Sequence, residues 1–124
     1  MNVLSASELS PEKHAEAEQR ASEYLKSIQR RAERGDADAQ FKLGKMNFFA
    51  EGVAENVTEA VKWLRLAADQ GHAEAQFQLG CLHDQGVGVA EDDAEAIKWY
   101  RLAAEQGHAD AQCNLGVRYV QGAG

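Results

Sequence analysis

The sequence predicts an all-α fold in which similar pairs of helices stack into a solenoid, and three observations indicate it. The stretch AADQGHAEAQ at residues 67–76 recurs as AAEQGHADAQ at residues 103–112, 36 positions later (103 − 67). A weaker copy, RAERGDADAQ, lies a further 36 positions upstream at residues 31–40. The chain also has a single proline in 124 residues, and proline is the residue that most disrupts helices.

The same period governs the larger residues and the glycines. A fixed repeat of this length is typical of solenoids, because one helical pair cannot bury both of its faces and must stack on the next. The matching positions are Gly35, Gly71 and Gly107; Gly44, Gly80 and Gly116; Gly52, Gly88 and Gly124; and Trp63 and Trp99.

These positions predict five segments along the chain. Residues 36–71 and 72–107 form two complete repeats, and residues 108–124 form a half repeat that holds only a first helix. Residues 11–35 form an N-terminal capping helix or half repeat, and residues 1–10 form a flexible N-terminus. The array is expected either to continue after the last segment or to be covered there by another chain.

Within a repeat the order is helix, glycine-containing loop, helix. The first helix of the second repeat is expected at residues 73–85, with Gly80 in its middle. A glycine there costs about 1 kcal/mol relative to alanine, so its recurrence indicates that a neighbouring helix presses against it. In the loops, Val53 and Val89 are expected to turn back into the core.

The second helix of each repeat carries clear signals at both ends. Asn56 and Asp92 are good N-caps, and Glu59 and Glu95 follow three residues later, as in a capping box. Gly107 and its equivalents are expected to end the helix in the left-handed conformation. The predicted buried face of these helices comprises Val61, Leu64, Ala67, Ala68, Ile97, Tyr100, Ala103 and Ala104.

The N-terminal helix is expected to begin at Ser10 as its cap, with Pro11 in the first turn. It should run to about Arg34 and present a polar outer side. Four of its residues stand in for the buried face of a second helix, namely Tyr24, Leu25, Ile28 and Ala32.

Charge and hydropathy exclude several classes of function. The net charge of −7 disfavours binding to nucleic acid or to an anionic lipid surface, and no apolar run approaches the roughly 20 residues of a membrane span. The start, MNVLSASELS, has no signal-peptide pattern. Cys81 and Cys113 lie on equivalent helices of neighbouring repeats, but at positions that differ by one helical turn. Their α-carbons are then too far apart for a disulfide, so two free thiols are expected. Free thiols favour the cytoplasm, whereas a removed signal peptide would allow a periplasmic or secreted location.

No motif indicates catalysis, a cofactor or a metal site. His72 and His108 are one repeat apart and serve as turn residues. Cys81 and His83 are two positions apart on a helix and therefore do not face each other. The GVGV run at residues 86–89 lacks the preceding strand and third glycine of a dinucleotide fingerprint. We therefore expect no catalytic residue, no cofactor and no metal.

The repeats resemble Sel-one-like repeats, a family related to tetratricopeptide repeats. The resemblance rests on AEAQFQLGCLHDQGVGVAEDDAEAIKWYRLAAEQG at residues 73–107 and covers residues 36–124. The family usually has tyrosine at the positions of Asn47 and His83, whereas Tyr119 keeps it; Ala50 stands where a glycine is usual.

The resemblance implies a right-handed α-α solenoid that acts as a non-enzymatic adaptor or scaffold, binding a protein or peptide. Bacterial members are often exported or linked to host interaction. By similarity with tetratricopeptide repeats, the first helix of each repeat lines the concave, partner-binding face. On this chain that face comprises Asp38, Phe41, Lys45, Phe48, Phe49, Glu74, Phe77, Cys81, Asp84, Gln85, Asp110, Cys113, Val117, Val120 and Gln121.

The first repeat departs from the second at the end of this helix. It carries Phe48 and Phe49 where the second has Asp84 and Gln85. Aromatic side chains dominate interface energies, so an exposed Phe49 is the best candidate anchor for a partner. Phe48 is better explained as a core residue that replaces the tyrosine missing at Asn47.

Two other functions stay open. In the first, the chain assembles into a homodimer through its open C-terminal edge, at Leu115 and Tyr119. In the second, it is a ligand-binding module of the cell envelope or has a hydrolase-like activity.

Overall fold

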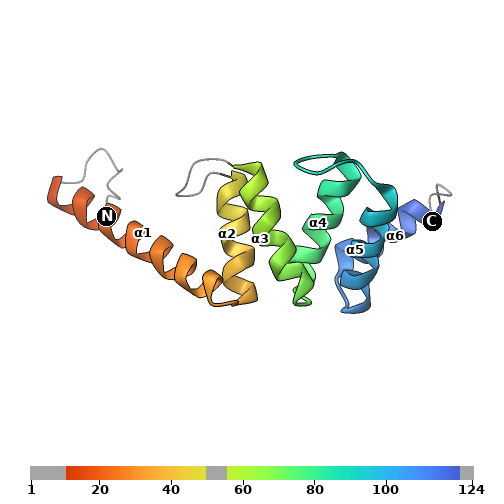
Figure 1. The fold of residues 1–124 in the computed structure, drawn as a ribbon, viewed down its shortest axis with the longest axis horizontal. Coiled ribbons are helices and arrows are strands. Elements are labelled where there is room, and N and C mark those ends of the chain that lie inside the picture. Colours follow the sequence, from red (N-terminus) through yellow and green to blue (C-terminus); the bar gives the residue numbers. More distant parts are fainter. Residues whose placement is uncertain (1–10, 50–55, 121–124) are drawn as a thin grey trace, which may run out of the picture.

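A computed structural model describes residues 11–49 and 56–120, and these residues form six α-helices and no strand. The prediction of an all-α fold is confirmed (Figure 1). The helices are α1 (Pro11–Glu33), α2 (Ala37–Phe49), α3 (Val57–Asp69), α4 (Ala73–Gln85), α5 (Asp93–Glu105) and α6 (Ala109–Val120).

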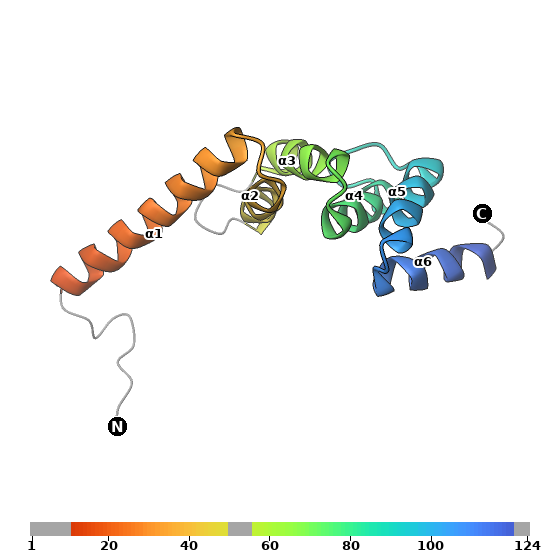
Figure 2. The same cartoon turned by 90° about the horizontal axis from the view of Figure 1, so that it is seen from below.

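The helices stack in sequence order as antiparallel pairs. α2 pairs with α3 and α4 with α5, while α1 packs on α2 and α6 packs on α5. Figure 2 shows that the stack is curved, with α2 and α4 on the inner side of the arc and α3 on the outer side. The first helices of the repeats therefore lie where their side chains can meet a ligand.

Two groups of buried side chains hold the stack together. One lies between the two complete pairs and includes Leu64, Leu79 and Leu82. The other joins α1 to α2 and includes Ile28 and Leu43. Val89 packs against the first group, as predicted for the loop valines, whereas Val53 lies outside the described residues.

The capping helix α1 ends at Glu33, next to the expected end at Arg34, but not all of its expected contacts form. The expected cap at Ser10 lies outside the described residues. Ile28 and Ala32 are buried and Leu25 is half-buried. Tyr24, expected to be buried with them, is 54% exposed. That expectation was wrong because only the last turns of α1 lie against α2, while the earlier turns extend beyond the stack (Figure 2).

The second helices begin at the predicted caps, but only half of the capping box forms. The Asp92 side chain accepts the N–H of Glu95 at 3.1 Å. The Asp92 N–H donates to the carbonyl of His83 at 2.9 Å, rather than to the Glu95 side chain. Asn56 makes the same pair of bonds in the first repeat. The cap therefore also fastens the start of each second helix to the end of the first.

The mid-helix glycines allow the two helices of a repeat to approach closely. A Cβ atom on Gly80 would lie 2.8 Å from the Tyr100 ring, and one on Gly44 would lie 3.0 Å from Leu64 Cγ. A Cβ atom on Gly116 would meet nothing within 4 Å. The third glycine therefore occupies the same register without a described helix packed against it.

These three glycines give a direct test of the packing. Gly80→Ala should lower the free energy of unfolding by about 1–3 kcal/mol, because the Tyr100 ring must shift in a packed core. Gly116→Ala is the matched control and should leave stability unchanged or raise it by up to about 1 kcal/mol, through helix propensity alone. Urea unfolding followed by circular dichroism measures both. Equal effects of the two substitutions would contradict the packing argument.

Candidate protein-interaction surface

A buried glutamine joins each repeat to the one before it. Gln76 is only 4% exposed. Its Nε2 donates to the carbonyl of Ala68 at 3.1 Å, and its Oε1 accepts the side-chain N–H of Gln106 at 2.9 Å. We call each such contact between the end of one repeat and the start of the next a joint. Gln40 makes the corresponding bonds in the preceding joint, with Ala32 and Gln70. These bonds satisfy a buried amide that would otherwise destabilise the fold, and they fix the spacing of the repeats.

A histidine at each joint caps one helix and contacts the first helix of the preceding repeat. Nδ1 of His108 accepts the N–H of Ala111 at 3.1 Å, and its Nε2 lies 2.5 Å from Glu74 Oε2. The ring stacks on Phe77, with centroids 4.6 Å apart. Because Nδ1 is an acceptor, the ring proton is on Nε2, and this N–H donates a hydrogen bond to the carboxylate.

His72 makes the same three contacts one repeat earlier. It caps α4 at Ala75, lies 3.0 Å from Asp38 Oδ1 and stacks on Phe41 at 4.6 Å. Four residues predicted to bind a partner, Asp38, Phe41, Glu74 and Phe77, therefore take part in the joints. Their side chains shape the inner face, and Asp38 remains exposed on it.

Sequence reasoning missed these joint contacts, although a signal for them was present. It treated His72 and His108 as turn residues and assigned no partner to them or to Gln76. The recurrence of glutamine and histidine at fixed positions could have indicated paired contacts. The identity of the partners became visible only once the helices were placed.

The histidine joint predicts a graded effect of substitution. His108→Ala should lower the free energy of unfolding by about 1.5–2.5 kcal/mol, from loss of the cap and of the ring stack. His108→Asn supplies a side-chain oxygen that can accept the same N–H in place of Nδ1, and it should cost about 1 kcal/mol less than the alanine variant. Urea unfolding of the two variants measures the difference. Identical midpoints for them would show that the cap contributes nothing.

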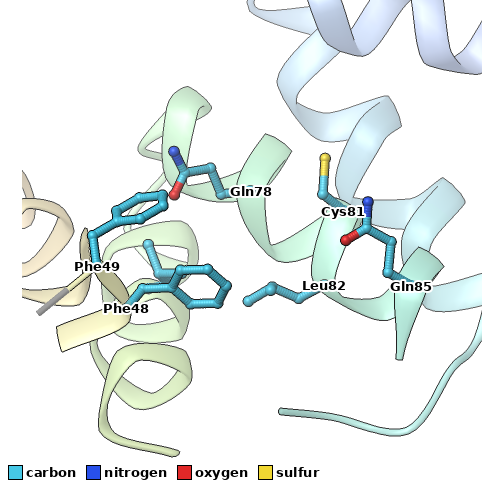
Figure 3. A pocket seen from close by; sticks show the side chains of 7 residues that line it. Phe48, Phe49, Gln78, Cys81, Leu82 and Gln85 are labelled. Carbon is cyan, nitrogen blue, oxygen red and sulfur yellow. The ribbon is translucent and has the colours of Figure 1, made fainter. Parts of the chain in front are cut away.

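The two phenylalanines at the end of α2 border a hollow that we call the apolar hollow. It has a volume of about 180 Å³ and is lined by Phe48, Phe49, Leu64, Gln78, Cys81, Leu82 and Gln85. Figure 3 shows Phe48 pointing toward Leu82, and Gln78 and Gln85 add amide groups to the lining. Phe48 packs against the core, whereas Phe49 is 59% exposed, as the sequence indicated for each.

Asp84 and Arg118 belong to a second, polar hollow between α4, α5 and α6. Its lining comprises Asp84, Glu91, Asp93, Asn114, Val117 and Arg118, and we call it the acidic hollow. Arg118 forms ion pairs with Asp84 and, at 2.8 Å, with Asp93. The Tyr100 hydroxyl donates to Asp84 at 3.2 Å. Asp84 is thus partly engaged within the fold rather than fully free for a partner.

The two cysteines are free, as predicted. Cys81 is half-buried in the apolar hollow, and burial raises the pKa of its thiol. A raised pKa keeps sulfur in the protonated form, which is a poor nucleophile. Within residues 11–49 and 56–120 there is no cluster of three or more His, Cys, Asp or Glu side chains arranged to hold a metal ion.

The remaining predicted surface residues lie on the inner helices or on the open edge. Lys45 lies over the Phe41 ring, with its Nζ 5.4 Å from the centroid. On α6, Val117 is 50% exposed and Leu115 is half-buried. Tyr119 is 51% exposed, and its hydroxyl accepts a hydrogen bond from Arg101 at 2.8 Å. Gln121 lies outside the described residues.

The paired helices, their repeated joints and the hollows between repeats define an α-α solenoid of the tetratricopeptide-like class. Family-model comparison matches the Sel1 repeat at residues 37–72, 73–108 and 109–124, one residue later than the repeat boundaries expected above. The chain belongs to the Sel1 repeat family.

Two solved structures carry the likeness further. A Sel1 repeat protein from Oxalobacter formigenes is 42% identical over 81% of this chain and 41% of its own, with a TM-score of 0.77. The protective antigen c5321, present in uropathogenic Escherichia coli strains and displaying an SLR fold, is 41% identical. It covers 77% of this chain and 20% of its own, with a TM-score of 0.74. The match therefore spans less than half of either structure, and it confirms the right-handed solenoid.

A search of curated proteins gave no match. None of the helices that the structure describes has the length and apolar character needed to cross a membrane.

Proposed function

We propose that the chain is a non-enzymatic scaffold that binds a segment of a partner protein on the inner side of α2 and α4. The observation that carries the proposal is the apolar hollow beside the exposed Phe49. Sel1 repeat proteins generally act as protein-interaction scaffolds, and the membership of the chain supports the same general role.

The chemistry of the hollow favours a side chain as its occupant. Its lining combines aromatic and aliphatic groups from Phe48, Phe49 and Leu82 with two amides, Gln78 and Gln85. Interfaces commonly have an apolar centre with polar groups around it. An apolar side chain of the partner would bury Phe49, while the two amides would form hydrogen bonds with the backbone of the partner segment.

The alternative hydrolase-like activity gains no support from the cysteine in this hollow. A nucleophilic thiol requires a lowered pKa, whereas burial raises that of Cys81. The arrangement is suited to binding rather than to covalent chemistry.

The proposed function is tested with peptides selected from a random library displayed on phage. The selected peptides should bind Phe49→Ala about ten-fold more weakly than the unsubstituted chain, as expected for an aromatic anchor. Isothermal titration calorimetry measures the affinity.

Leu66→Ala is the matched control, because Leu66 is also exposed, at 41%, but lies on the outer helix α3. It should leave affinity unchanged. Unfolding midpoints of both variants should stay close to that of the unsubstituted chain. Peptides that bind Phe49→Ala with undiminished affinity would sink the proposal.

A second candidate is self-association through the open face of α6. Leu79 is fully buried in the group between the two complete pairs, whereas its equivalent Leu115 is only half-buried, and a Cβ atom on Gly116 would meet nothing within 4 Å. A helix from a second copy would cover this apolar face and form a homodimer.

Self-association predicts a solution mass that rises with protein concentration. Leu115→Glu and Tyr119→Glu should each hold the chain as a monomer, because a carboxylate on the covered face would lose its hydration. Light scattering over a concentration series measures the mass, and circular dichroism checks that helical content is retained. A monomeric mass for the unsubstituted chain at all concentrations would rule this candidate out.

A further inference from the structure

The apolar and acidic hollows occupy the same position in successive repeats. Shifting by 36 residues carries Phe48 to Asp84 and Leu82 to Arg118 (48 + 36 = 84; 82 + 36 = 118). Both hollows lie between the first helices of consecutive repeats. A partner segment that follows the inner side of the stack would meet one hollow and then the other.

The side chains that fill these equivalent positions differ in kind. In the earlier joint, Phe48 and Val57 pack against the core group that contains Leu82. In the later joint, the equivalents are Asp84, Asp93 and Arg118, joined as ion pairs. An apolar contact has thus been replaced by a charged one at the same place in the solenoid.

The charges of the acidic hollow do not cancel. Three carboxylates line it, from Asp84, Glu91 and Asp93, against one guanidinium from Arg118, which leaves a formal charge of −2 (1 − 3). Arg118 is engaged with two of the carboxylates, and its side chain is only 13% exposed. Glu91 is exposed, and it forms no ion pair with the residues that the structure describes.

A group of acidic side chains is usually only a hydrated part of the surface. Here it lies in register with the apolar hollow on the inner side of the stack. Near α2 the same side carries both a cation, Lys45, and the exposed carboxylate of Asp38. The acidic hollow therefore differs from the α2 end in that its carboxylates outnumber its one cation.

We propose that the acidic hollow selects a basic side chain in the segment bound by the apolar hollow. The occupant is a protein segment with an apolar side chain at Phe49 and a lysine or arginine at Glu91 and Asp93. This inference rests on the proposed function and assigns specificity and direction to the same surface. Complementary charge at the rim of an interface sets register and orientation more than raw affinity.

The experiment uses the peptides selected on phage against the unsubstituted chain. The sequences should share an apolar residue and, several positions away, a lysine or arginine. Affinity is then measured by fluorescence anisotropy for the chosen peptide and for a version with alanine in place of the basic residue. Each peptide is titrated at low and high salt.

Glu91→Gln is the cleanest variant, because Glu91 takes part in no ion pair within the described fold. It should weaken binding of the basic peptide about two- to five-fold, the range for one exposed ion pair. The alanine peptide should bind Glu91→Gln and the unsubstituted chain equally. Asp93→Asn, as a second variant, should act in the same direction, and high salt should remove both differences.

Glu105→Gln is the charge-matched control, since Glu105 is exposed at the far end of α5. It removes the same charge away from the hollow and should leave both affinities unchanged. An equal loss with this control would mean that only the overall charge matters, and the inference would fail.

The outcomes separate the two proposals. Binding that depends on Phe49 but not on Glu91 or Asp93, or selected peptides without a basic residue, would overturn the inference and leave the proposed function standing. Failure to select any peptide whose binding depends on Phe49 would contradict the proposed function itself.

Discussion

The structure depends on one buried polar contact, the side-chain amide of Gln76 between the end of one repeat and the start of the next. A buried amide requires hydrogen-bond partners, and the observed placement of the helices provides both the Ala68 carbonyl and the Gln106 side chain. Hydrophobic burial alone would allow the helices to slide. The glutamine makes the joint specific, which explains why the chain repeats a whole decapeptide rather than a hydrophobic pattern.

The contacts at the joints determine which side chains of the first helices remain available on the inner face. The first helices α2 and α4 each use one side for the joint and another, at the mid-helix glycine, for the second helix of the same repeat. A third side remains for solvent or a ligand. The histidine stacks hold Phe41 and Phe77 against the joints, so Phe49 is the exposed aromatic side chain of helices α2 and α4.

The sequence could predict whatever the repeat itself encodes. Local pattern and period predict the order of the helices, the caps at Asn56 and Asp92, and the close approach of a neighbouring helix at Gly80. They also predict that Phe49 is more exposed than Phe48. The Gln106 partner of Gln76 and the Glu74 partner of His108 could not be predicted, because they lie 30 and 34 positions away along the chain. The exposure of Tyr24 was missed for a related reason, since local pattern does not show how far α1 extends beyond α2.

Positions that differ between repeats are therefore the informative ones for binding. The joint residues recur because each joint must satisfy the same buried groups, so they cannot distinguish one partner from another. Where Phe48 gives way to Asp84, the helices still pack, and the substitution changes only what the hollow offers to a ligand. In this way a repeat protein can keep the same joint residues in every repeat, so that the fold is preserved, while the residues of the hollows differ from one repeat to the next. One surface then offers a hydrophobic contact in one repeat and an ionic contact in the next.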